Sequence, residues 1–524
     1  MNGASSALYG TNAIGGVINI ITDDAKNAIN VSSDTRYASK GRFTQSVNID
    51  VNTGKFGSYT SYRRQQAEGW QLNPYEENSK THELEETGKV ASTGFYANTV
   101  NQKFTFDATD KLSFYARGGY YDNKTRRPYE AYDYNILHET FNYGIGAQYM
   151  INKGNYITAD CYADHFSSSY CFFKDNKTYN GKAGEEQVRK RTRNHNLSIK
   201  GIFKLGNRHK LSVGTEYIVD VLKSQTDNIA KEDAYTLALF AQDEIKLLRN
   251  LQALIGVRYI YHENFKNHAT PNVALMYKPG KFNFRASYAA GFRTPTLSEL
   301  YATDIAKKND RLTIGNLDLK SEKNNYFSLS AEYVHERFSV SVNAFYNNIR
   351  DMIDYNTIAT GDKAMEQYGH KEVRQRDNIA EAKVHGINVS ANAYLGAGFN
   401  LSGGYTHLNT QDVELGQPID KSIKNAYNIN AQWAHSWKIY RLNINLNGRI
   451  NSKRFSKSYG YAPEYQLWNL NTRHSFNLKS VIIEPGCGME NLFDYMDDRP
   501  YNSNYATLTP GRSFYISLSL KFKS

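Results

Sequence analysis

The sequence predicts an all-β protein, a transmembrane antiparallel β-barrel of about 22 strands with short periplasmic turns and long extracellular loops. Three observations predict this fold. Apolar and polar residues alternate along most of the chain from about residue 28, and the links between the alternating segments are alternately short and long. No run of 18 or more apolar residues occurs, so the sequence offers no transmembrane helix.

The alternation is clearest near the end of the chain, between residues 513 and 522. Phe514, Ile516, Leu518, Leu520 and Phe522 alternate there with Ser513, Tyr515, Ser517, Ser519 and Lys521. Side chains of a strand point to opposite faces in turn, so this segment has one apolar and one polar face. Its ten residues are enough to cross a bilayer as a tilted strand.

The links between segments are sorted by length. The segments begin near residues 28, 43, 56, 95, 111, 140, 154, 192, 208, 235, 252, 270, 281, 324, 337, 377, 398, 425, 438, 465, 480 and 512. Links after even-numbered segments are tight turns, whereas most links after odd-numbered segments are long, such as 66–94, 123–139, 166–191, 220–234, 291–323, 350–376, 408–424, 450–464 and 491–511. An up-and-down barrel produces this order. A propeller or solenoid would instead show sequence repeats, and we find none.

Composition narrows the class of protein further. The 41 Tyr residues outnumber the 25 Phe residues, as expected where aromatic girdles mark the membrane interfaces. The net charge of +11 fits nucleic acid, an anionic ligand, an anionic lipid surface or simple solubility, and nucleic acid is the weakest of these because no nucleic-acid motif accompanies the charge. Three cysteines cannot form a disulfide framework, and a bridge between Cys161 and Cys171 is left open.

The first 22 residues carry a motif, a Gly-rich turn followed by a short apolar strand. Its defining residues are Tyr9, Gly10, Gly15, Gly16 and Asn19. A phosphate-binding loop is a weak alternative, because no Lys-Ser/Thr pair or helix follows the glycines. The segment resembles the end of the plug domain of TonB-dependent outer-membrane receptors.

Further segments fit the same family. Residues 291–301 open the longest loop, and residues 315–322, which include Asn316, close it without the two prolines that the family usually has there. Residues 491–494, beginning at Asn491, and the final strand from Pro510 complete the set. In the 384–388 segment, Asn388 stands where the family usually has Glu.

This resemblance implies two domains, a C-terminal remnant of the plug at residues 1–26 and a 22-stranded barrel at residues 27–524. It implies a monomeric barrel in the outer membrane, in contact with lipopolysaccharide, that imports a scarce nutrient with energy from the TonB complex. Met1 is not followed by a signal peptide, so we expect a fragment or a start further upstream. The alternative function is a truncated barrel without a plug that acts as a passive pore or an inactive remnant.

The resemblance favours a ferric siderophore as the imported ligand, with cobalamin and haem as alternatives. No His lies between Pro295 and Asn316, which counts against one mode of haem binding. We expect no catalytic, cofactor or resident metal site, and we read the loop histidines as solvated side chains. Arginines for an anionic chelate and tyrosines for stacking give the candidate ligand contacts Arg126, Arg127, Tyr129, Tyr132, Arg189, Arg191, Arg293 and Tyr301. The basic residues among them could instead contact lipopolysaccharide.

Overall fold

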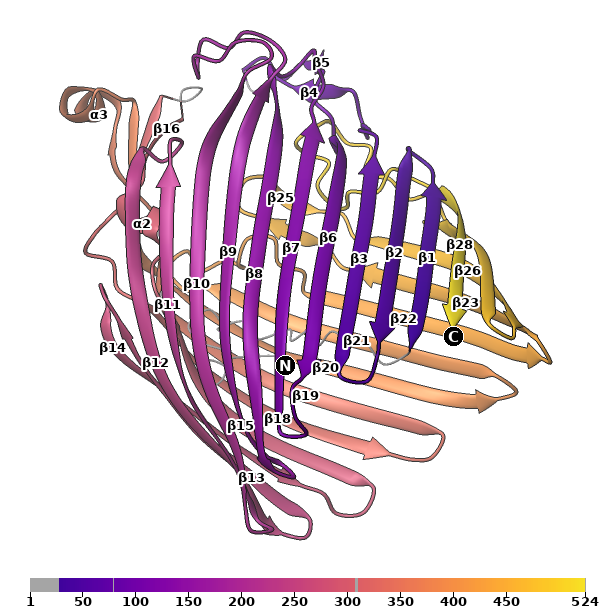
Figure 1. Cartoon of the computed structure of the whole chain (residues 1–524). Helices are drawn as coiled ribbons and strands as arrows, with labels where there is room; N and C mark the ends of the chain where they lie inside the picture. Colours follow the sequence, from indigo (N-terminus) through magenta and orange to yellow (C-terminus); the bar gives the residue numbers. More distant parts are fainter. Residues whose placement is uncertain (1–27, 79, 307–309, 524) are drawn as a thin grey trace.

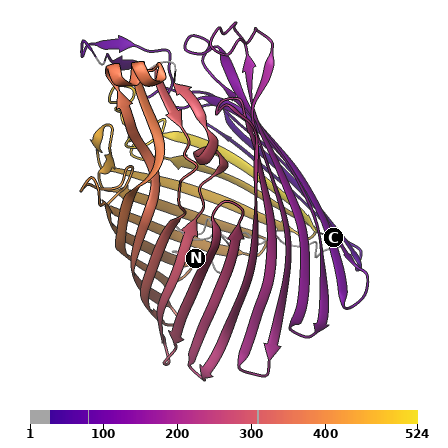
Figure 2. The ribbon, with the colours of Figure 1, turned by 90° about the vertical axis from the view of Figure 1, so that its left-hand side faces the viewer.

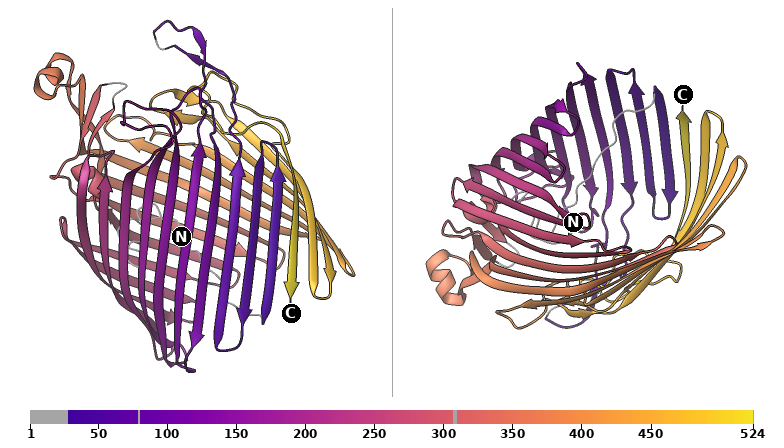
Figure 3. Two further views of the ribbon diagram at one scale, coloured as in Figure 1. Left: turned by 45° about the horizontal axis from the view of Figure 1, so that its top comes forward. Right: turned by 90° about the horizontal axis from the view of Figure 1, so that it is seen from below.

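The computed structural model describes residues 28–78, 80–306 and 310–523. Within them, 22 strands form one closed barrel in which each strand pairs antiparallel with the next and the first strand, β1, pairs with the last, β28. The strands tilt steeply around the ring (Figure 1, Figure 3). The predicted fold class and strand number are therefore confirmed. The predicted plug remnant at residues 1–26, with its motif residues, lies outside the described residues.

The barrel strands are β1 (Ile29–Ala38), β2 (Arg42–Asn52), β3 (Phe56–Ala67), β6 (Gly94–Asp107), β7 (Leu112–Arg126), β8 (Tyr134–Asn152), β9 (Asn155–Phe172), β10 (Glu186–Leu205), β11 (His209–Ser224), β12 (Ile229–Leu248), β13 (Leu251–His262), β14 (Lys266–Tyr277), β15 (Phe282–Arg293), β18 (Glu322–Val334), β19 (Phe338–Thr360), β20 (Glu372–Gly396), β21 (Phe399–Asp412), β22 (Asn425–Trp437), β23 (Tyr440–Asn451), β26 (Tyr465–Leu478), β27 (Val481–Glu490) and β28 (Ser513–Lys523).

The remaining described elements lie in the long links. They are β4 (Tyr75–Glu77), β5 (Leu84–Glu86), α2 (Leu297–Tyr301), β16 (Thr303–Ala306), β17 (Arg311–Ile314), α3 (Gly361–Tyr368), β24 (Arg454–Ser456) and β25 (Gly460–Ala462). The long links gather at one end of the barrel, which we call the loop end, and α3 projects from this end (Figure 2). None of the helices that the structure describes is long and apolar enough to span a membrane.

The two faces of the barrel wall differ as the alternation predicts. Large apolar side chains such as Ile145, Leu197 and Ile516 are exposed on the outer face, where a bilayer would cover them. The luminal face is polar, and Arg258 and Asn324 are among its most buried side chains. The described chain therefore has no single apolar core, only small apolar clusters at the wall and beneath the loops.

Several strands begin earlier than the sequence predicts, and some predicted loops are correspondingly shorter. β8, β10, β12 and β20 begin at residues 134, 186, 229 and 372, rather than near 140, 192, 235 and 377. The predicted loop 220–234 shrinks to residues 225–228. These strands continue beyond the apolar band of the barrel, where both of their faces meet water. The hydrogen bonds between strands persist there, but the alternation of apolar and polar residues that marks a half-buried strand is lost.

The structure also shows whether the cysteines form disulfides. Cys161, Cys171 and Cys487 are all free. Cys161 and Cys171 lie on the same strand, β9, and ten residues of strand span roughly 33 Å. A disulfide needs Cα atoms within about 7 Å, so these two cysteines cannot pair in this fold.

Candidate ligand-binding site

Arginine and tyrosine side chains gather at the loop end of β7 to β10. The group, which we call the Arg–Tyr cluster, consists of Arg127, Tyr132, Tyr134, Tyr170, Tyr179 and Arg189. The strand register places Tyr134 and Tyr170 on the luminal face, because the alternate residues of β9, such as Cys161, belong to the exposed outer face. The cluster is thus positioned at the mouth of the barrel.

The cluster is a continuous stack. The Arg127 guanidinium lies 3.6 Å from the ring centre of Tyr132 and 4.7 Å from that of Tyr134. The rings of Tyr134 and Tyr170 stack at 4.1 Å. The Arg189 guanidinium lies 5.3 Å from the Tyr170 ring. Two cations therefore cover the ends of an aromatic platform, an arrangement that favours cation–π attraction.

Hydrogen bonds between two loops hold this stack in place. The Arg127 backbone N–H donates to Asn135 Oδ1 at 2.8 Å, and the Tyr132 N–H donates to the Pro128 carbonyl at 3.1 Å, which closes a turn. In the facing loop, Asn176 Nδ2 donates to Asp133 Oδ2 at 2.7 Å. The links after β7 and β9 are therefore tied to each other, and their aromatic rings are held in register.

The electrostatics of the cluster leave cationic groups available to a ligand. Burial raises the pKa of the Tyr170 phenol, and it also raises the pKa of Tyr179, so both hydroxyls stay protonated near neutral pH. Arg189 Nη1 donates to Gln225 Oε1 at 2.9 Å, while its Nε is buried without a hydrogen-bond partner. The cluster thus offers positive charge, aromatic faces and phenol donors, which together suit an anionic aromatic ligand.

A polar cleft of about 680 Å³ opens beside the cluster, where β10 and β11 end. Tyr179 and Arg189 line it from the cluster, and Arg191 and Lys223 line it from the outer face. Arg191 stands opposite Ser167 and two residues from Arg193, so the register places its side chain on the exposed outer face of β10. The basic run from residue 189 is therefore divided between the two faces of the sheet.

Other predicted contacts lie near the cluster or apart from it. Tyr129 stacks on Phe173 at 5.4 Å, and the Lys174 ammonium lies 3.7 Å from the centre of its ring. Arg126 lines a separate cavity of about 260 Å³ together with Arg64 and its neighbours on β1, β3 and β6. Of the predicted residues, Arg127, Tyr132 and Arg189 join the cluster, Tyr129 borders it, and Arg126 does not reach it.

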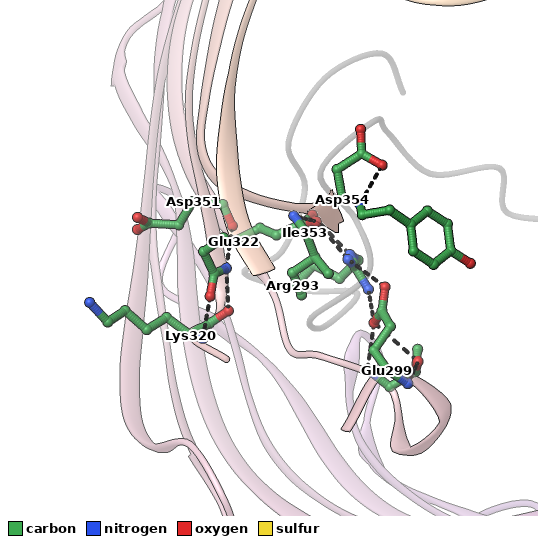
Figure 4. A network of polar contacts seen from close by, with 10 residues as sticks. Arg293, Glu299, Lys320, Glu322, Asp351, Ile353 and Asp354 are labelled. Atoms are coloured by element: carbon green, nitrogen blue, oxygen red, sulfur yellow. Dashed lines mark hydrogen bonds and ion pairs between the residues drawn. The ribbon is translucent and has the colours of Figure 1, made fainter. Parts of the chain in front are cut away.

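Arg293 lies elsewhere, in a network of carboxylates beneath the longest loop (Figure 4). Its guanidinium binds Glu322 at 2.6 and 2.8 Å and Glu299 at 2.8 and 3.2 Å. Glu299 is the third residue of α2 and forms a capping box with Thr296. The hydrogen bonds to Glu322 raise the pKa of Arg293, which therefore stays charged and clamps α2 to the start of β18. Tyr301, at the end of α2, packs against the apolar cluster below it.

The two described motif asparagines are structural. Asn316 Nδ2 donates to the Arg376 carbonyl at 3.0 Å, and its Oδ1 accepts from the Asp318 N–H at 2.9 Å. Asn491 is 3% exposed, and its Oδ1 accepts from the Tyr495 N–H at 3.0 Å. Each asparagine closes a loop end with its own side chain.

Three members of the cluster, Tyr134, Tyr170 and Tyr179, are not among the eight candidate contacts given above. Tyr170 lies within residues 166–191, which the sequence predicts to be a loop, and nothing in the sequence separates it from the many girdle tyrosines. The facing basic run near Arg189 was the available signal. Among the described residues, no group of three or more His, Cys, Asp and Glu side chains lies close enough to hold a metal ion.

Comparison with known proteins gives the family. The family model described as "TonB dependent receptor-like, beta-barrel" matches residues 45–483. The chain is 22% identical to the ferric enterobactin receptor of Pseudomonas aeruginosa over 615 aligned positions, which cover all of this chain and 80% of that protein.

Solved structures share the fold. A crystal structure of a mutant of the Pseudomonas aeruginosa ferric enterobactin receptor has a TM-score of 0.84 at 17% identity, covering all of this chain and 84% of that one. The siderophore receptor PirA from Acinetobacter baumannii has a TM-score of 0.78 at 16% identity, with coverage of 100% and 84%. The chain therefore belongs to the TonB-dependent receptors, a family of transport receptors whose barrels lie in the outer membrane.

Proposed function

We propose that this receptor takes up a ferric siderophore, with the iron bound as cargo and with the TonB complex as its energy-supplying partner. The Arg–Tyr cluster carries the proposal. A ferric siderophore with aromatic iron-binding groups presents negative charge and flat rings together, and the cluster offers Arg127 and Arg189 at the ends of a stacked pair of tyrosines. The similarity to proteins named as ferric enterobactin and siderophore receptors also supports it.

The location of the cluster supports the same function. It lies on the luminal face at the loop end, which faces the cell exterior in barrels of this kind. A ligand arriving from outside would meet the cluster before it entered the lumen. Opposite charge at such a mouth also raises the local concentration of an anionic ligand.

Equilibrium binding of radioiron-labelled ferric enterobactin to the purified receptor in detergent tests the proposal. Replacing Arg127 and Arg189 together with Ala should weaken binding at least tenfold, since a hydrogen bond to a charged group contributes about 1.5–3 kcal/mol. The matched control is Arg193→Ala, which removes a cation from the outer face of the same strand and should leave the affinity unchanged.

Two outcomes count against the proposed site. The double variant could bind as tightly as the wild type, or Arg193→Ala could weaken binding just as much. A neutral chelate of similar size that bound equally well would also contradict the role of charge. Ring removal in Tyr134→Leu should cause a smaller, several-fold loss, because aromatic pairing contributes about 0.5–1.5 kcal/mol.

A further inference from the structure

His268, on β14, contacts both ends of the longest loop, which comprises residues 294–321. Its imidazole stacks on the Phe292 ring, with 4.5 Å between the ring centres and 21° between the ring planes. Its Nε2 lies 3.3 Å from the hydroxyl oxygen of Ser321. Phe292 is the penultimate residue of β15, where the loop begins, and Ser321 is the last residue before β18, where the loop ends. One side chain therefore joins the entry and the exit of the loop.

The partners of His268 are closely packed. Phe292 and Ser321 are 2% and 3% exposed, and Phe292 packs against the fully buried Ala238 and Ile260. Ile260 is directly opposite His268 in the pairing of β13 with β14. His268 is thus a packed side chain rather than the solvated loop residue that the sequence predicts. Burial of this kind disfavours the charged form of an imidazole.

The hydrogen bonds of His268 suit a neutral ring. The imidazole donates to the backbone carbonyl of Phe265, in the turn between β13 and β14, so its Nε2 is left to accept from the Ser321 hydroxyl. Protonation would turn both ring nitrogens into donors. The Ser321 hydroxyl would then have to accept, and its own proton would lose its acceptor in a buried place. A buried donor without an acceptor is costly, so protonation opposes the contact that holds the loop exit.

The charges around His268 also oppose protonation. Lys323, on β18, repels a positive charge on the ring. Lys266 lies two residues earlier on the same face of β14, and Arg258 lies diagonally across on β13. The carboxylates on the elements around His268 already have partners, namely Glu299 and Glu322 with Arg293, Glu263 with the Tyr235 N–H, and Glu216 with Arg258.

His262, the other imidazole of this region, has a different environment. It is 7% exposed, and its Nδ1 accepts from the Asn264 N–H at 3.1 Å. Asp220, on β11, lies close enough to compensate a positive charge on His262. The His262 ring contacts the Phe265 ring, 5.0 Å away, rather than the loop ends. His268 is therefore the histidine whose protonation bears on the loop.

We propose that His268 is an acid-sensitive latch, which holds the exit of the longest loop on β14 while it is neutral and releases the exit when it is protonated. After release the imidazole meets water, where the pKa of a histidine is about 6.5. The released form therefore takes up a proton that the docked form excludes. Release is then favoured as the pH falls below about 6.5, while the backbone pairing of β13 with β14 stays intact.

Hydrogen exchange of the purified receptor in detergent, from about pH 7.5 to about pH 5.5, tests the proposal. The amide of Lys320, at the loop exit, donates to Asn378 Oδ1 at 2.7 Å and reports on docking of the exit. Its protection factor should fall about tenfold by about pH 5.5, because one proton taken up on release gives up to tenfold per pH unit. The amides of β13 should keep their protection.

Three variants separate the latch from a general effect of acid. His268→Gln cannot be protonated and should remove the pH dependence at Lys320. The matched control is His138→Gln, which removes an imidazole that stacks on Phe166 at 5.5 Å on β8, and which should keep the pH dependence. Lys323→Gln should move the onset of release to higher pH, because it removes a charge that opposes protonation of His268.

Several results would overturn the proposal. They are an unchanged protection of Lys320 in the wild type, an equal loss in the wild type and His268→Gln, and a loss that extends to β13. An onset in Lys323→Gln at the wild-type pH or below it would do the same. Lys323→Gln leaves the imidazole in place, so its result decides the matter even where His268→Gln weakens the loop.

Discussion

Replacing Arg293 with Met should release the longest loop while the barrel stays folded. The side chains of Arg293, Glu299 and Glu322 are 24%, 14% and 10% exposed, so the change leaves two nearly buried carboxylates without their cation. Removing one partner of a buried ion pair costs about 3–5 kcal/mol. The lower end applies here, because Glu322 still accepts from the Ile353 N–H at 2.9 Å and Glu299 from the Thr296 N–H at 2.8 Å.

Hydrogen exchange measures this release directly. A cost of about 3 kcal/mol raises the open population of the loop about a hundredfold. The amides of Leu300 and Ala302, which donate to the carbonyls of Thr296 and Ser298, should exchange faster by that factor, while amides of β13 keep their rates. Arg293→Lys should show a smaller acceleration, because an ammonium cannot reproduce the guanidinium fork. Unchanged exchange at α2, or an equal acceleration throughout the barrel, would refute the clamp.

Two further predictions concern the wild-type loop and the barrel wall. The pKa of Glu299 lies below its ordinary value near 4.5, because burial, which raises it, is outweighed by hydrogen bonds from Arg293 and its cap. Its stabilisation is therefore complete above about pH 4.5 and lost as the pH falls through the lowered value. The protection factors of the α2 amides, which are corrected for the intrinsic dependence of exchange on pH, should fall on acidification, and protection that fell on alkalinisation instead would contradict this. Gly386→Ala should lower the unfolding temperature of the barrel, measured by the temperature at which its gel mobility shifts. The new Cβ would lie 2.2 Å from the His407 carbonyl oxygen, and relieving this clash costs about 1–3 kcal/mol. Gly403→Ala, on the paired strand with only an ordinary contact, should not, and equal shifts in both variants would rule out the clash.

The sequence predicts the barrel well because the bilayer imposes a pattern on it. Strands that follow short turns, such as β3, β9 and β21, begin within one or two residues of the predicted positions, since Gly and Asn mark the turns and the apolar band begins beside them. Strands that follow the long loops are harder to place. β8 begins six residues earlier than predicted. Its first residues pair with the neighbouring strands outside the membrane, where water meets both faces and neither face needs to be apolar.

The site was less predictable because it depends on which loops meet. Arg127 and Tyr132 are close in the sequence, and their contact could be anticipated from the loop that they share. Tyr170 reaches the same stack through the pairing of β8 with β9, which brings Ile136 opposite Tyr170. Arg293 shows the opposite error. The sequence predicts that it contacts an anionic ligand, but its donors are engaged by Glu299 and Glu322. Composition identifies candidate residues, whereas only the register identifies their partners.

One register irregularity divides the basic run of β10 between the two faces of the sheet. Residues 189–193 read in the sequence as a single basic run. Between Val188 and Lys190 the pairing of β10 with β9 shifts, so that Arg189 is an extra residue without an opposite partner. Arg189 turns to the Tyr170 ring, whereas Arg191 and Arg193 take the outer face. Deleting Arg189 would leave Val188 opposite Ser169 and Lys190 opposite Ser168, so Arg191 and Arg193 should keep the outer face. The deletion variant should bind ferric enterobactin more weakly, because the stack loses one of its two cations, and an affinity equal to that of the wild type would contradict the role of Arg189.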